Sequence, residues 1–215
     1  MNTFVYFFLG FGYLFLLLWS ISLTRKEKHL KLSNIILLVI IGLIYDNFII
    51  ALGSCIGEGS LLENLSYPRY WLHALFTPTL ILFAWSICME AEISLAKKTF
   101  VKVIAFLLTL CLIGYELFTS VIGIELSANW ENGLLTYESS SQSMNGVMVI
   151  VVTTVLVGVG FILWRRLHFP WLFIGTLLMI FGSGIGLWMK DFPVMNILEF
   201  ILLFSLVLAK RFTNE

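Results

Sequence analysis

Four ionisable side chains interrupt long apolar segments of the sequence, namely Asp46, His73, Glu116 and Glu199. A charge in apolar surroundings is costly, so such residues usually face an interior site and need a partner. A carboxyl group in an apolar site can stay protonated and act as a general acid, whereas a carboxylate that accepts hydrogen bonds stays ionised and can act as a base. We therefore predict that these four residues are catalytic, with Asp46 and Glu116 as the candidate acid and base.

The four residues lie at a similar depth in their segments. Counted from the same end, they are roughly three to seven positions in, which is about 5 to 10 Å at the rise of an α-helix. This common depth predicts one site built from four helices. Polar side chains next to them, or about one helical turn away, are predicted to contact a substrate. This second set is Tyr45, Asn47, Thr77, Tyr115, Ser120 and Asn196.

Two other interpretations of the ionisable residues stay open. Polar side chains also link helices through hydrogen bonds, so the residues can be structural. A divalent metal held by Asp46, His73, Glu116 and Glu199 is the second alternative. Catalytic zinc usually takes two or three histidines, and only His73 lies within an apolar segment. We therefore expect no metal and no other cofactor.

The composition places the helices in a membrane. Of the 215 residues, 60% are hydrophobic and only 12% are charged. A soluble domain contains about a quarter charged residues, and a disordered chain contains few apolar ones, so both classes are excluded. The net charge of +0 gives no basic surface for nucleic acid. The expected partners are membrane lipids and a hydrophobic small-molecule substrate.

Seven apolar segments are long enough to span a bilayer as helices. They cover about residues 4–23, 35–53, 70–88, 100–121, 144–164, 170–189 and 194–208. Stripes of small residues, such as Gly160 in the fifth segment and Gly175 and Gly182 in the sixth, predict close contacts between helices. The sequence thus predicts an all-α, polytopic integral membrane protein in which residues 1–215 form a single bundle of seven transmembrane helices.

Lys and Arg gather in alternate connections between these segments. One set of connections holds the clusters at residues 25–31, 97–102, 165–166 and 210–211, whereas the other set holds only Arg69 and Lys190. Connections rich in Lys and Arg stay in the cytoplasm. We therefore predict a multi-pass protein of the cell membrane with its N-terminus outside and its C-terminus in the cytoplasm.

Two of the connections predicted to lie outside are long. We expect residues 54–69 to form a connection long enough to have structure of its own, with Pro68 in the first turn of the helix that follows. Residues 123–145 contain Glu125, Glu131 and Glu138 but no Lys or Arg, and we expect them to form a solvated cap.

Two groups of membrane enzymes have a comparable size and topology. The seven-span hydrolases of the alkaline ceramidase and adiponectin-receptor type use several histidines around zinc, and this sequence lacks a second histidine in its final spans. In size, number of spans and use of acidic residues, the chain is similar to the small integral-membrane terpene cyclases, although it shares no motif with them. This similarity of architecture implies a lipid or isoprenoid-like substrate.

These features favour an intramembrane enzyme that performs acid–base chemistry in a polar pocket in the outer half of the bilayer. A non-enzymatic receptor, a carrier of protons or small solutes, and a membrane scaffold are the alternatives. The enzyme requires a cavity that contains the four ionisable residues. A carrier requires a polar path to the other side of the membrane, and a scaffold is expected to be a filled bundle.

Overall fold

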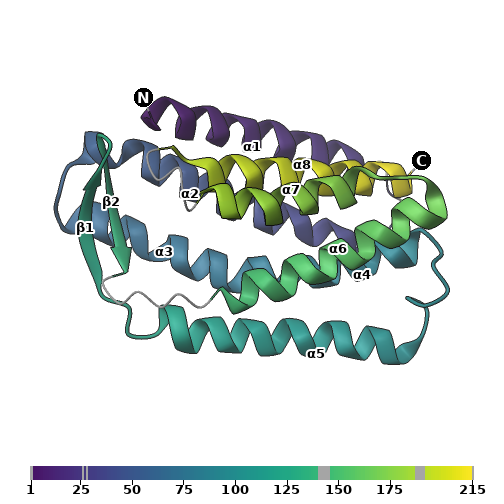
Figure 1. Cartoon of the computed structure of the whole chain (residues 1–215). Coiled ribbons are helices and arrows are strands. Elements are labelled where there is room, and N and C mark those ends of the chain that lie inside the picture. The colour runs from purple at the N-terminus through teal and green to yellow at the C-terminus, as the bar shows by residue number, and fades with distance from the viewer. Residues whose placement is uncertain (1, 26, 28, 140–145, 187–191, 215) are drawn as a thin grey trace.

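The chain folds into a bundle of long helices with one β-hairpin (Figure 1). The computed structural model describes residues 2–25, 27, 29–139, 146–186 and 192–214. The helical elements are α1 (Asn2–Thr24), η1 (Leu32–Ile35), α2 (Ile36–Ile56), α3 (Ser60–Phe76), η2 (Thr77–Thr79), α4 (Leu80–Glu90), α5 (Thr99–Glu116), the π-helical η3 (Leu117–Val121), α6 (Val147–Leu167), α7 (Trp171–Gly186) and α8 (Val194–Asn214). The hairpin consists of β1 (Leu126–Glu131) and β2 (Leu134–Ser139).

Five helical stretches of the described chain are long and apolar enough to cross a membrane. They are Asn2–Thr24, Leu32–Ile56, Ser60–Glu90, Thr99–Val121 and Val147–Leu167. These stretches contain most of the first five predicted segments, so the predicted helical, membrane-type architecture is confirmed. Within the described residues, α7 is shorter than these five stretches, and α8 contains three charged residues, Glu199, Lys210 and Arg211. Neither helix is therefore among the five. The count of seven spans and the direction of insertion stay predictions.

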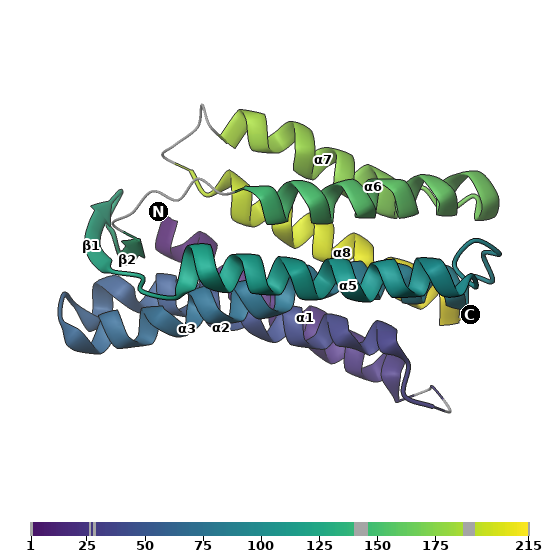
Figure 2. The same cartoon turned by 90° about the horizontal axis from the view of Figure 1, so that it is seen from below.

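The helices run in alternate directions, with α3, η2 and α4 forming one continuous stretch, so the connections lie at two ends of the molecule (Figures 1 and 2). The N-terminal end of α1, the hairpin and the start of α8 lie at one end, which we call the hairpin end. The C-terminal end of α8 and the connections between α1 and η1 and between α4 and α5 lie at the other, which we call the basic end. Among the described Lys and Arg residues, only Arg69 lies nearer the hairpin end.

Small residues allow the later helices to pack closely, as their spacing predicted. A Cβ atom on Gly160 of α6 would lie 2.7 Å from the backbone nitrogen of Phe173 in α7. A Cβ atom on Gly175 of α7 would lie 2.4 Å from Ser205 Oγ of α8. Both distances are shorter than atoms tolerate, so α6, α7 and α8 depend on glycine at these crossings.

The connection predicted at residues 54–69 is mostly helical, which corrects the predicted start of the next helix near residue 70. The α3 helix begins at Ser60, so Pro68 lies inside the helix instead of in its first turn. Leu62 is buried in a small apolar cluster with Ile49 of α2 and Leu135 of the hairpin. This packing stabilises the early turns of α3, and a single proline does not outweigh it.

Part of the expected acidic cap, residues 126–139, is an antiparallel β-hairpin that packs on α2 and α3. Asn132 and Gly133 form its two-residue turn with φ angles of 52° and 80°, as a type I′ turn requires. Ser54 of α2 holds the turn side of the hairpin through hydrogen bonds with the Gly133 carbonyl oxygen (2.9 Å) and the Leu135 amide (3.1 Å). Residues 140–145 of this connection lie outside the described part of the chain.

A group of hydrogen-bonded polar side chains, the Lys210 cluster, lies inside the basic end. Lys210 is fully enclosed, at 0% exposure, and donates to Thr24 Oγ1 (2.8 Å) and to Asn34 Oδ1. Its Nζ atom lies 3.7 Å from Glu27 Oε1. The Glu27 carboxylate also accepts hydrogen bonds from Asn34 Nδ2 (2.9 Å) and Asn214 Nδ2 (3.0 Å). The cluster thus joins the ends of α1 and α8 to η1.

Candidate functional site

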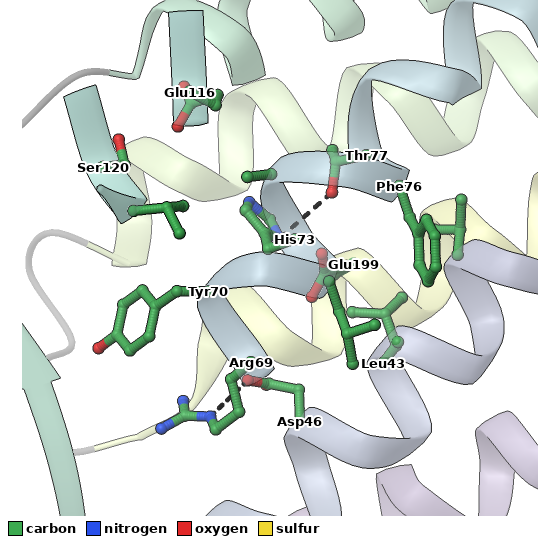
Figure 3. A pocket seen from close by; sticks show the side chains of 15 residues that line it. Leu43, Asp46, Arg69, Tyr70, His73, Phe76, Thr77, Glu116, Ser120 and Glu199 are labelled. Carbon is green, nitrogen blue, oxygen red and sulfur yellow. Dashed lines mark hydrogen bonds and ion pairs between the residues drawn. The ribbon is translucent and has the colours of Figure 1, made fainter. Parts of the chain in front are cut away.

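A cavity of about 260 Å³ lies inside the hairpin half of the bundle. Its walls come from α2, α3, η2, α8 and the adjoining ends of α5 and η3. Asp46, His73, Glu116 and Glu199 all line this cavity. Figure 3 shows Glu116 and Asp46 on opposite sides of it, with His73 and Glu199 between them. The structure therefore brings together the four ionisable residues that the sequence singled out.

The α3 helix supplies one polar stripe of the cavity wall. Arg69, His73 and Thr77 follow one another at four-residue spacing, which places them on one helical face. The Thr77 hydroxyl forms a 3.2 Å hydrogen bond with Nδ1 of His73. The imidazole is exposed although His73 lies inside the bundle, because the cavity borders it. Thr77 thus orients the ring, and the ring presents its other nitrogen for contact with a ligand.

Asp46 of α2 forms an ion pair with Arg69. The Nε atom of Arg69 donates to Asp46 Oδ1 over 2.7 Å, and the side chains are 14% and 23% exposed, respectively. The Arg69 guanidinium also lies over the Tyr70 ring, with 5.9 Å between Cζ and the ring centroid. Both Arg69 and Tyr70 line the cavity. This pair places a carboxylate and its counter-ion on the same wall.

Glu116 lies on the opposite wall, where α5 changes into the π-helical η3. The residue is only 5% exposed, and its Oε1 atom has no hydrogen-bond partner among the described residues. A buried polar atom without a partner is costly, and a bound molecule, an ion or a catalytic role is among its explanations. Four other buried side-chain atoms of the described residues share this property, namely the Tyr13, Ser20 and Ser33 hydroxyl oxygens and Asn47 Oδ1. Ser120 of η3, which also lines the cavity, lies one turn further along and shares a 3.3 Å contact with the Thr119 hydroxyl.

Glu199 of α8 lies where the cavity meets a second, smaller hollow of about 40 Å³. Val39, His73, Thr77 and Glu199 line both spaces. Further from the hairpin end, the walls of the smaller hollow become almost wholly apolar. They are formed by Leu80, Val149, Val152, Met179, Leu202 and Leu203, together with Thr153, whose hydroxyl donates to the Val149 and Ile150 carbonyl oxygens of its own helix. The polar character of the site therefore fades toward the basic end.

Four residues predicted to contact a substrate lie outside the lining of the cavity. The Tyr45 hydroxyl donates to the Leu65 carbonyl oxygen over 2.8 Å and joins α2 to α3. Asn47 is enclosed in α2 and donates to the Leu43 carbonyl oxygen. Asn196 Oδ1 accepts a 3.4 Å hydrogen bond from Tyr6, and Tyr115 lies beside Glu116 in the chain without lining the cavity. Of the predicted contact set, Thr77 and Ser120 line the cavity.

Arg69 is a site residue that was not among the predicted ones, because the next helix was predicted to begin only at residue 70. A signal was present, since Arg69 lies four residues before His73 and eight before Thr77. Such spacing indicates one face of a helix, but it applies to Arg69 only when the helix begins before residue 69.

The ionisable groups that line the cavity differ in their surroundings. Among the described residues, no group of three or more His, Cys, Asp and Glu side chains is arranged to hold a metal ion. The enclosed carboxyl group of Glu116 and the ion-paired Asp46 offer two acids in different surroundings, which is the usual basis for separate acid and base roles. His73 and Glu199 add two further ionisable groups to the lining.

No protein-family model matches the chain, and a search among curated proteins found no significant relative. Functional inference therefore depends on the cavity itself.

Proposed function

We propose that this protein is an intramembrane enzyme that performs acid–base chemistry on a lipid or isoprenoid-like substrate in the cavity. The observation that carries the proposal is a cavity of about 260 Å³, inside apolar helices, that four ionisable side chains from four helices line together. A cavity with a few convergent polar groups is the usual form of a small-molecule site. The unpartnered Oε1 atom of Glu116 supports a site that is completed by a ligand.

Two alternative functions have less support from the described residues. A scaffold was expected to be a filled bundle, whereas this bundle contains the cavity. A carrier was expected to have a polar path toward the other side, whereas leucine, valine and methionine dominate the smaller hollow below the cavity. A receptor for a hydrophobic ligand would use the same cavity, and only turnover separates it from an enzyme.

The chemical roles follow from the surroundings of each group. Glu116 is the proposed proton donor, because its carboxyl group is enclosed and no described residue binds Oε1. Asp46 is the proposed base, because Arg69 supplies a fixed counter-ion for its ionised form. His73, oriented by Thr77, and Glu199 lie between the two and are proposed to carry protons across the cavity.

We further propose that all seven apolar segments span the cell membrane, with the basic end in the cytoplasm and the hairpin end outside. The support is the distribution of described Lys and Arg residues, which leaves only Arg69 nearer the hairpin end. In this arrangement the cavity lies in the outer half of the bilayer, the half from which we propose that the lipid substrate enters. The C-terminus is then cytoplasmic.

The proposal is tested by comparing the lipids of cells that produce wild type, Asp46→Asn or Glu116→Gln at matched membrane levels. Lipid mass spectrometry should show one precursor consumed and one product formed in the wild type only. Glu92→Gln is the matched control, since this carboxylate is exposed at the basic end and lies 3.9 Å from Lys97. If both cavity variants left the lipid pool the same as wild type does, the enzymatic proposal would be wrong.

A further inference from the structure

Arg69 has far more hydrogen-bond donors than its described surroundings use. A guanidinium group carries five N–H donors, and among the described residues only Asp46 Oδ1 accepts one of them, from Nε. The side chain is 14% exposed, so bulk water reaches only a small part of it. A shielded cation with open donors favours an anionic partner that can accept several hydrogen bonds at once.

The open donors belong to the end of the guanidinium that faces away from Asp46. Because Nε holds the carboxylate from the side, the two terminal nitrogens stay available as a fork. Such a fork fits two oxygens of one phosphate or carboxylate group. The ion pair with Asp46 therefore fixes the guanidinium in place for an anion without occupying its terminal nitrogens.

The cavity changes from polar to apolar along the stripe that begins at Arg69. His73 and Thr77 follow at one-turn intervals, and Leu80 lies in the smaller hollow beyond them. From Arg69 to Leu80 the chain rises about 16 Å at the spacing of a helix. A ligand that follows this gradient is charged at the hairpin end and hydrocarbon toward the basic end.

We infer that the cavity binds an amphipathic lipid with an acidic headgroup. The terminal nitrogens of Arg69 hold the headgroup anion, and the first part of the hydrocarbon chain extends past His73 and Thr77 toward Val152 and Leu202. This inference rests on the proposed function, which it extends from a class of reaction to a class of substrate. It also assigns Arg69 a binding role, whereas Asp46 and Glu116 carry the proposed chemistry.

The test is lipid binding by native mass spectrometry in a neutral detergent, with hexadecyl phosphate and hexadecanol as probes that differ in the phosphate. Wild type should bind hexadecyl phosphate roughly 10- to 100-fold more tightly than hexadecanol, as charge-assisted hydrogen bonds predict. Arg69→Gln should remove this preference. Arg165→Gln, which removes an exposed arginine at the basic end, should retain it.

A second variant guards against misfolding, because Arg69→Gln leaves Asp46 without its counter-ion. Asp46→Asn/Arg69→Gln removes both charges and should also lose the preference for phosphate. Inorganic phosphate alone should bind at least about tenfold more weakly than hexadecyl phosphate, since it lacks the apolar chain. Equal binding of the two long-chain probes by wild type, a preference that survives in both variants, or equally tight binding of inorganic phosphate would overturn the inference.

The orientation of the ligand's hydrocarbon chain has its own test. Val152→Phe narrows the smaller hollow and should weaken the binding of hexadecyl phosphate while leaving that of butyl phosphate the same. Equal loss for both probes would contradict the orientation.

If the preference for phosphate fails while Glu116→Gln still stops lipid conversion, only the assigned ligand class is wrong. If Glu116→Gln leaves conversion intact, the proposed function itself fails, whatever the probes show.

Discussion

Two groups of polar side chains lie inside the described part of the bundle, one in each half. They differ in how many of their hydrogen-bonding atoms have protein partners. In the Lys210 cluster, Lys210 and Glu27 are held by direct hydrogen bonds and lie in contact with one another. In the cavity, the same kinds of groups surround open space, and Glu116 keeps an unpartnered oxygen. Satisfied polar networks fix a structure, whereas unsatisfied ones leave room for a ligand.

The contrast teaches that burial of charge does not by itself identify a functional site. Lys210 is more completely enclosed than Arg69, at 0% against 14% side-chain exposure. The lysine nevertheless donates to several protein atoms, whereas one Asp46 oxygen is the only hydrogen-bond acceptor of the arginine among the described residues. The number of open donors and acceptors separates the two groups better than depth does. Three substitutions at polar residues test this distinction, and a fourth, at Gly53, tests the packing of the hairpin beside the cavity.

The largest effect is expected at Lys210. Lys210→Met leaves the Glu27 carboxylate, itself 3% exposed, without its cation, and breaking a buried pair in this way costs about 3 to 5 kcal/mol. Thermal unfolding in one detergent should shift down by roughly 6 to 20 °C for a chain of this length. Lys98→Met, an exposed lysine at the same end, is the control. An unchanged unfolding midpoint in Lys210→Met would show that the Lys210 cluster does not stabilise the fold.

Gly53→Ala tests the attachment of the hairpin beside the cavity. A Cβ atom at this position would lie 1.9 Å from the Leu135 carbonyl oxygen, so the hairpin must shift. We expect a loss of about 1 to 3 kcal/mol in the free energy of unfolding. Gly114→Ala, at a helical glycine with open space around it, should be neutral or slightly stabilising. Equal stability of the two variants would show that the hairpin is not firmly packed on α2.

Thr77→Val tests the support of His73 with little change in shape. The variant loses the 3.2 Å hydrogen bond to Nδ1, and a net value of about 0.5 to 1.5 kcal/mol corresponds to a 2- to 10-fold fall in turnover. Thr154→Val removes a hydroxyl of α6 that bonds the Ile150 carbonyl oxygen outside the cavity, and turnover should stay the same. Equal turnover in the two variants would exclude a role for Thr77 in positioning the imidazole.

Glu116→Gln should give the smallest change in stability. The amide has the shape of the carboxyl group, and no described hydrogen bond at Oε1 is lost, so the free energy of unfolding should stay within about 0.5 kcal/mol of wild type. The same detergent assay used for Lys210→Met provides the comparison. A loss as large as that at Lys210 would mean that Glu116 is a structural residue, and the difference between the two polar groups would disappear.

Hydropathy and charge predicted much of the helical architecture. Long apolar runs specify helices in a membrane because the backbone must satisfy its own hydrogen bonds there. The start of α3 escaped prediction because residues 60–67 are mixed in polarity and are stabilised by contacts with the hairpin. The hairpin itself had a local signal in Asn132-Gly133, which the acidic composition of the segment obscured.

The four ionisable residues of the cavity could be predicted from the sequence, but the ion pair between Asp46 and Arg69 could not. The cost of burying an ionisable side chain identified Asp46, His73, Glu116 and Glu199 as candidates. Their similar depth in the helices predicted that they share one site, and all four line the cavity. Equal depth does not specify rotation about a helix axis, which is why Asn47, next to Asp46, faces away from the cavity. The Asp46–Arg69 pair depends on the crossing of α2 and α3, which lies beyond the reach of sequence spacing.

The most direct test of a ligand site in the cavity is an experimental density map of the protein extracted with its native membrane lipids. We predict elongated density that is not protein between Arg69 and Glu116, with its densest end against the guanidinium and its other end directed past His73 toward Leu202. Side chains that fill this space, or isolated water molecules without any lipid, would contradict the account.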